Sequence, residues 1–197
     1  MSLLFGITGY IGSGKTTIAH GLEELGEAVY YSDLGARRIM LENAHVREEL
    51  VTLLGRDIYA GGELNRAAIA AKIFHNKSLL RKVNSIVHPA VCNDVLRWSK
   101  RLNRPYCFVE SAILFTSGLR DICSGVILVN APEELIIRRA MERDDRSREE
   151  VLSRLISQRE EEFNYKAIDL ILSNDGTESI TELCLRVQRF CSNFAGQ

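Results

Sequence analysis

The chain has 197 residues, of which 46% are hydrophobic and 26% charged, and its formal net charge is −1 at pH 7. A chain of this length can bury the core of one domain that carries a mobile insert. The near-neutral charge argues against a dedicated nucleic-acid-binding protein, which normally shows a strongly basic domain. No apolar run approaches about 18 residues and no basic flank precedes the first apolar run, so we expect a cytoplasmic protein without a membrane span or secretory signal.

The first predicted element is a buried strand at 3–7, followed by a glycine-rich turn and a helix. Residues 9–16 read Gly-Tyr-Ile-Gly-Ser-Gly-Lys-Thr, which is the phosphate-loop pattern G-x-x-x-x-G-K-[ST]. The glycines let successive main-chain N–H groups point at phosphate oxygens, and the helix adds its positive end. We therefore expect Lys15 to reach the β- and γ-phosphates and the Thr16 hydroxyl to hold Mg²⁺. The full set of expected nucleotide-binding residues in this loop is Gly9, Gly12, Ser13, Gly14, Lys15, Thr16 and Thr17. The alternative is a glycine-rich turn that only joins a strand to a helix.

Further short apolar runs follow at 28–31, 106–109, 126–129 and 170–172, with helix-like stretches between them. Short, uniformly apolar runs are typical of parallel strands covered on both faces. With intervening helices they predict an α/β fold with a doubly wound parallel sheet. Such sheets bind ligands beyond the carboxyl ends of their strands, which places the phosphate loop, Asp33 and Glu110 on one rim.

Two helix-like segments differ from this alternation. Residues 33–102 show no convincing strand and carry twelve basic against seven acidic residues, which favours an insert that binds an anionic second substrate. Solvated helix faces with random charge are the alternative. Residues 138–166 carry eight basic and eight acidic residues and few core-forming positions, which predicts a lid over bound nucleotide.

We therefore expect one domain, 1–197, with its core at 1–32, 103–137 and 167–197. The tail at 179–194 has apolar residues at helical spacing and predicts a packing helix. The cysteines are odd in number, widely spaced and without a C-x-x-C pair, so we expect free thiols in a reducing compartment. They are Cys92, Cys107, Cys123, Cys184 and Cys191.

The phosphate loop alone does not separate GTPases, motor ATPases and kinases. The chain lacks the N-K-x-D motif of a GTPase, and its only candidate for the strand-ending acid of a motor ATPase is Glu110. A small-molecule kinase needs a base on the rim and an arginine-bearing lid. Asp33 follows the second strand directly, and Arg139 and Arg143 lie one helical turn apart. The alternatives are a helix N-cap for Asp33 and a solvated basic face for the two arginines.

Several stretches, in order from residue 3 to about 176, follow a single pattern. They lie at 7–17, 29–37, 64–74, 83–89, 112–119, 139–144, 154–158 and 169–176. They include Asp33-Leu34-Gly35-Ala36-Arg37, Val87-His88-Pro89 and Arg139-Ala140-Met141-Glu142-Arg143-Asp144. In these stretches the chain resembles the dephospho-CoA kinase family, a group of phosphate-loop kinases.

The resemblance implies that ATP and 3′-dephospho-CoA are converted to ADP and CoA, with Mg²⁺ and with phosphate transferred to the ribose 3′-hydroxyl. It implies that Asp33 accepts the hydroxyl proton or orients the hydroxyl. Arg139 would offset charge on the transferring phosphoryl group, with Arg143 nearer the nucleotide. Arg66 and His88 would help hold the acceptor, although a hydrogen-bonded histidine before a helix-ending proline is the alternative for His88. Gln158 and Arg154 would touch the adenine or hold the lid shut.

Four positions depart from the family pattern. Tyr10 replaces a glycine, Tyr31 the first aspartate of D-x-D, and Ala112 and Thr116 the proline and glutamate of P-L-L-F-E. The last three leave acceptor selectivity open. A kinase of another nucleoside, nucleotide or small alcohol, and a non-catalytic ATP-sensing module, therefore remain alternatives. We expect small-molecule partners only, and a monomer or weak homo-oligomer.

Overall fold

The structure is a computed structural model that describes residues 2–74, 76–160 and 165–196. The chain forms two compact units, one of residues 1–30 with 99–197 and the other of residues 31–98. No helix among the described residues is long and apolar enough to cross a membrane. All five cysteines are free thiols, as expected, and all but Cys92 are buried.

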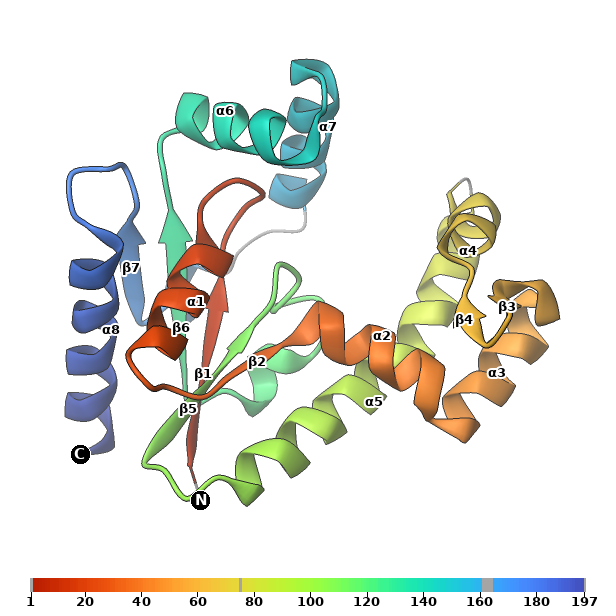
Figure 1. The fold of residues 1–197 in the computed structure, drawn as a ribbon, viewed down its shortest axis with the longest axis horizontal. Coiled ribbons are helices and arrows are strands. Elements are labelled where there is room, and N and C mark those ends of the chain that lie inside the picture. Colours follow the sequence, from red (N-terminus) through yellow and green to blue (C-terminus); the bar gives the residue numbers. More distant parts are fainter. Residues whose placement is uncertain (1, 75, 161–164, 197) are drawn as a thin grey trace. The chain divides into compact units, whose positions relative to one another are not determined.

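A five-stranded sheet forms the centre of the first unit (Figure 1). Its strands are β1 (Leu3–Thr8), β2 (Val29–Tyr31), β5 (Tyr106–Glu110), β6 (Gly125–Asn130) and β7 (Leu170–Ser173). The order is β2-β5-β1-β6-β7, and β1 pairs in parallel with β5 and β6, as β6 does with β7. The five apolar runs of the sequence are therefore the five strands, and the predicted α/β class with a parallel sheet is confirmed.

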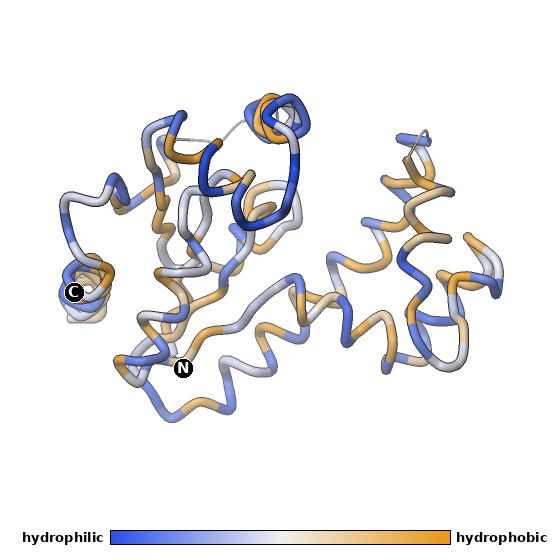
Figure 2. The backbone as a smooth tube through the Cα atoms, turned by 45° about the horizontal axis from the view of Figure 1, so that its top comes forward, coloured by the Kyte–Doolittle hydropathy of each residue, from blue (hydrophilic) through white to orange (hydrophobic). Residues whose placement is uncertain are grey.

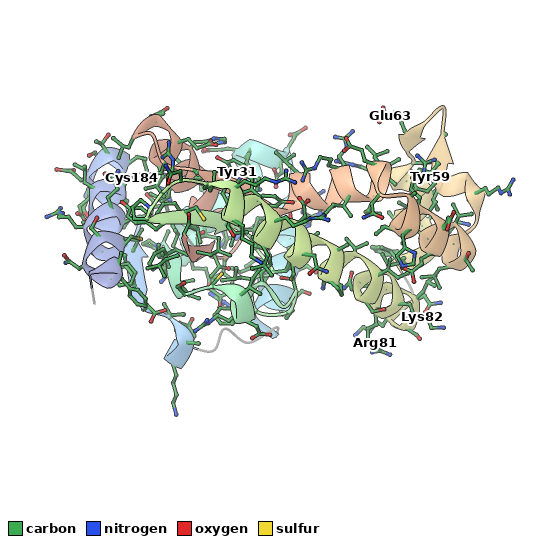
Figure 3. All side chains as sticks on the ribbon, turned by 90° about the horizontal axis from the view of Figure 1, so that it is seen from below. Tyr31, Tyr59, Glu63, Arg81, Lys82 and Cys184 are labelled. Carbon is green, nitrogen blue, oxygen red and sulfur yellow. The ribbon has the colours of Figure 1, made fainter. Side chains whose placement is uncertain are left out.

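One face of this sheet is covered by α1 (Lys15–Glu24) and α8 (Ile180–Ala195). The buried residues of α8 recur at helical spacing (Leu183, Cys184, Val187 and Cys191), and its tube carries both hydrophobic and hydrophilic segments in Figure 2, as an amphipathic packing helix requires. Figure 3 shows Cys184 on α8, and its buried thiol lies 3.5 Å from the carbonyl oxygen of Ile18 on α1. The helix begins with a capping box in which Ser179 and Glu182 satisfy each other's backbone N–H groups. The predicted packing helix is thus confirmed.

The segment after β5 turns through η2 (Leu119–Ile122) before β6 begins. It lies close to β1, since a Cβ on Gly6 would come within 2.6 Å of Leu114. Glycine at that position lets the buried Leu114 side chain reach the strand.

Two helices, α6 (Glu133–Asp144) and α7 (Arg148–Glu160), stand above the carboxyl ends of β1 and β6 (Figure 1). They form most of the predicted lid, whose residues 161–164 lie outside the described residues, and η3 (Tyr165–Ala167) follows. Few of the described residues in 138–166 are core positions, as expected: Ala140, Val151 and Leu155 are buried and form a small apolar seam with Ile11 and Ile137.

The second unit is mainly helical. It contains α2 (Ser32–Glu42), α3 (Ala44–Leu54), η1 (Arg56–Ile58), α4 (Arg66–Ile73) and most of α5 (Lys77–Arg101). It also contains a short antiparallel hairpin of β3 (Tyr59–Ala60) and β4 (Glu63–Leu64), so the expectation of no strand between 33 and 102 is wrong. Gly61 and Gly62 both have positive φ, as a two-residue hairpin turn requires. Strands of two residues are too short to show an apolar pattern.

Polar contacts fix this hairpin to the helices around it. The Tyr59 hydroxyl donates to the carbonyl oxygen of Met40 at 2.7 Å, and the Arg47 guanidinium lies 4.4 Å from the Tyr59 ring centroid. Figure 3 labels Tyr59 and Glu63 at the hairpin and Arg81 and Lys82 on α5. Arg81 and Lys82 are exposed and belong to the positive excess of this unit.

Candidate nucleotide-binding site

The phosphate loop joins β1 to α1 at the carboxyl edge of the sheet. Gly12 and Gly14 have φ values of 74° and 94°, in the left-handed region that favours glycine. A Cβ on Gly12 would lie 2.2 Å from the carbonyl oxygen of Ile136, and one on Gly14 would lie 2.1 Å from Nδ2 of Asn174. Only glycine fits at these positions, where the loop lies against α6 and the segment after β7. Left-handed glycines before a helix are the geometry that turns main-chain N–H groups toward an anion.

The first turn of α1 has the polarity that a phosphate needs. Gly14 caps the helix without a side-chain hydrogen bond, so no side chain competes for the first N–H groups. Lys15 is largely buried as the first helical residue, whereas Thr17 is exposed. Ser13 is fully buried, and its hydroxyl makes no hydrogen bond within the described residues. A buried hydroxyl at this place suits an incoming phosphate oxygen.

Glu110 was expected on the rim of the sheet but was not selected as a site residue from the sequence. It ends β5 with only 6% of its surface exposed, and its Oε1 accepts a hydrogen bond of 3.2 Å from the Thr16 hydroxyl. A hydroxyl and a carboxylate oxygen are hard donors of the kind that Mg²⁺ takes, usually together with substrate phosphates. The two residues therefore fit the expected metal. The signal in the sequence was a single acid after a strand, which was too general to select.

Asn174 connects the phosphate loop to the rest of the rim. It is 4% exposed, its Nδ2 donates to the Ser13 carbonyl oxygen at 2.9 Å, and its backbone N–H donates to Asn130 at 2.7 Å. Its own carbonyl oxygen accepts from Nη1 of Arg139 at 2.9 Å. One buried residue thus links the loop, the end of β6 and α6.

The two arginines chosen from the sequence lie on α6, one turn apart. Arg139 is half-buried and held by Asn174, as described above. Arg143 is exposed and makes two hydrogen bonds to Asp144, at 2.8 and 2.9 Å. These bonds raise the pKa of Arg143, and the negative charge of Glu110 adds to the shift. The cation therefore shares an electrostatic environment with the Thr16–Glu110 pair.

Helix α7, part of the predicted lid, contacts the phosphate loop directly. Oε1 of Gln158 accepts a hydrogen bond of 2.8 Å from the backbone N–H of Ile11. Arg154 is exposed on the same helix, and its charge contributes to a lowered pKa of Asp144, which is caused mainly by Arg143. Of these two residues, Gln158 is the one in contact with the loop.

Comparison with known proteins agrees with this geometry. The model of the dephospho-CoA kinase family matches residues 3–179. The chain belongs to the dephospho-CoA kinase family. A dephospho-CoA kinase from Porphyromonas gingivalis is 42% identical over 165 residues, which cover 84% of this chain and 82% of that protein. A Thermus thermophilus structure superposes with a TM-score of 0.82 at 36% identity, covering 95% of this chain and 96% of that one. The structure of dephospho-CoA kinase from Campylobacter jejuni superposes with a TM-score of 0.72 at 27% identity, covering 98% of each chain.

The remaining residues selected by the family resemblance lie in the second unit. Asp33 is exposed in the first turn of α2, whose N-cap is Tyr31, so Asp33 is not the N-cap that the alternative required. An acid in this turn still benefits from the positive end of the helix. Arg66 is exposed as the first residue of α4.

His88 lies within α5 and is half-buried, and this burial lowers its pKa. The helix continues past Pro89 to Arg101, so the alternative of a histidine before a helix-ending proline is wrong. Of the departures from the family pattern, Tyr31 ends β2 and is half-buried, while Thr116 is exposed beside the carbonyl oxygen of Ile113.

Proposed function

We propose that this chain transfers the terminal phosphoryl group of ATP to the ribose 3′-hydroxyl of 3′-dephospho-CoA in the cytoplasm, giving ADP and CoA. The observation that carries the proposal is the Thr16–Glu110 pair beside an uncapped helix end and a glycine loop. This arrangement supplies N–H donors, a lysine and two metal-binding oxygens at one edge of the sheet. Membership of the dephospho-CoA kinase family supports the choice of acceptor.

In this proposal the loop binds the phosphates through its main-chain N–H groups and the Ser13 hydroxyl, with Lys15 on the β- and γ-phosphates. When bound, Mg²⁺ neutralises charge on the phosphate oxygens, and Thr16 and Glu110 are the residues that would hold it. Arg139 offsets charge on the transferring group, and its bond to Asn174 already restricts the guanidinium. Arg143 acts nearer the nucleotide.

Asp33 accepts the proton of the acceptor hydroxyl, or orients that hydroxyl, as transfer proceeds. A carboxylate can take this role because the proton leaves late in a loose transition state. Arg66 and His88 help hold the acceptor, whose phosphates complement the excess of basic residues between 33 and 102.

A coupled assay of ADP release tests this function. Turnover should depend on dephospho-CoA, and mass spectrometry should identify CoA as the product. Asp33→Asn should lower kcat by about 10²–10⁴-fold with little change in ATP affinity. Glu42→Gln, at an exposed acid on the same helix, is the matched control. Turnover that requires another alcohol, or tight ATP binding with no acceptor-stimulated turnover, would contradict the proposal.

A further inference from the structure

Tyr10, the first residue after Gly9 in the phosphate loop, makes two contacts with residues at the end of the lid. The Arg159 guanidinium lies 5.9 Å from the centroid of its ring. Partial burial, together with a hydrogen bond between its hydroxyl and Tyr165, raises the pKa of Tyr10 to about 12. The phenol is therefore neutral and a hydrogen-bond donor over the whole physiological range.

The next residue is held from the same side. Ile11 gives its backbone N–H to Gln158, and its side chain, 7% exposed, packs in the apolar seam with Val151 and Leu155. Two consecutive loop residues, Tyr10 and Ile11, thus contact two consecutive residues of α7, Gln158 and Arg159. The phosphate loop is therefore held to the end of α7 at two neighbouring points.

Arg159 is itself oriented. Its Nη2 lies 2.6 Å from Oε2 of Glu133, the first residue of α6. The Arg159 guanidinium therefore bridges the start of α6 and the Tyr10 ring. Because Glu133 already fixes the guanidinium, packing of the ring on it costs little additional side-chain entropy. A surface ion pair and a single cation–π contact are each weak alone. Here the ion pair with Glu133 orients the same guanidinium that contacts the Tyr10 ring, so the two interactions support one another.

The loop has a reason to need such support. Gly9, Gly12 and Gly14 all have positive φ, and glycines lose more conformational freedom on ordering than any other residue. A loop that samples other conformations binds its ligand more weakly, in proportion to the fraction of competent molecules. Attachments at Tyr10 and Ile11 increase that fraction before any ligand is present.

We propose that Tyr10 is a positioning residue of the nucleotide site: its ring under Arg159 and its hydroxyl on Tyr165 hold the phosphate loop in its binding conformation. This inference rests on the proposed binding of ATP. Because these contacts lie within the protein, they support the substrate complex and the transition state alike. Their loss therefore changes nucleotide affinity and leaves kcat unaltered.

Calorimetric titration of ADP and a non-hydrolysable ATP analogue tests the proposal in the full chain. Tyr10→Ala should weaken nucleotide binding about tenfold, the sum expected for a cation–π contact and one hydrogen bond. Tyr10→Phe and Tyr165→Phe should each weaken it about threefold, and the double variant no further, because both remove the same bond. In all variants kcat should stay within about twofold and KM for dephospho-CoA should not change.

Tyr106→Phe is the matched control, since it removes a hydroxyl that bonds Glu27 from the first residue of β5, at the opposite end of that strand from the site. It should leave nucleotide affinity unchanged. Nucleotide affinity within twofold of wild type in Tyr10→Ala would overturn the proposal, as would additive effects of the two Phe substitutions. If Tyr10→Ala fails to fold, the nucleotide affinities of Tyr10→Phe, Tyr165→Phe and the double variant test the proposal instead.

The two proposals fail separately. A wild-type chain that binds ATP but does not phosphorylate dephospho-CoA would refute the proposed function, and the affinity series would still test Tyr10. A wild-type chain that binds no nucleotide would overturn both.

Discussion

The hydroxyl of Thr16 and the carboxylate of Glu110 are 3.2 Å apart although 94 positions separate them in the chain. The sheet brings them together, because β1 and β5 are parallel neighbours and Ile7 lies opposite Glu110. The end of β5 is thereby placed beside the start of the phosphate loop. A carboxylate in this place suits a metal ion bound to phosphates.

Glu110→Gln should weaken Mg²⁺ dependence without disturbing the fold. The amide keeps the shape and an oxygen for Thr16 but lacks the charge, so the apparent affinity for Mg²⁺ should fall by about 10–100-fold. Initial rates over a Mg²⁺ series at saturating ATP measure this. Glu23→Gln, at an exposed acid of α1, is the control. Identical Mg²⁺ curves for Glu110→Gln and wild type would exclude Glu110 from the metal site.

Arg139→Ala should lower kcat by about 10²–10³-fold, the usual cost of removing one donor that stabilises developing charge. Arg138→Ala removes the neighbouring arginine, which is exposed on the same helix. It should retain most activity. Steady-state kinetics of both variants compare the two roles directly, and equal losses would favour a general basic face over a specific one.

Asn174→Ala should destabilise the protein and weaken ATP binding. It leaves the Ser13 carbonyl without its buried donor, which costs about 1–3 kcal/mol of unfolding free energy. Urea denaturation measures this cost, with the exposed Asn193→Ala on α8 as control. Asn174→Asp should weaken ATP binding more than Asn174→Ala, because it adds a negative charge beside the loop. A stability equal to that of wild type in Asn174→Ala would show that the link is dispensable.

His88 should make stability depend on pH. Burial lowers its pKa from the ordinary value of 6.5, so below that pH the unfolded chain binds a proton more readily than the folded chain. The free energy of unfolding should therefore fall as pH drops through 6.5 toward the lower folded pKa. Urea denaturation at about pH 7.5 and about pH 5 should show a smaller decrease for His88→Gln than for wild type. The exposed His45→Gln should behave as wild type.

The fold was largely predictable because its determinants are local. Each strand of the five-stranded sheet is one apolar run, and the glycines and Lys15 of the phosphate loop lie within eight residues. The contributions of Glu110 and Asn174 to the site were not predictable in the same way, since their partners depend on strand register and on chain segments far apart. The attachment of Tyr10 to Arg159 is equally non-local. The β3–β4 hairpin did leave a local signal, the Gly61-Gly62 pair, but its strands are too short for periodicity.

The position of β1 in the sheet has a consequence for synthesis on the ribosome. The strand that leads into the phosphate loop is made before its two neighbours in the sheet, β5 and β6, which lie within residues 106–130. A nascent chain that has not yet reached residue 106 therefore carries the phosphate-loop motif beside β1, whose partner strands are still missing. The free edges of β1 can then pair with the wrong strands. The sheet that positions the phosphate loop is therefore completed only after β5 and β6 have been made.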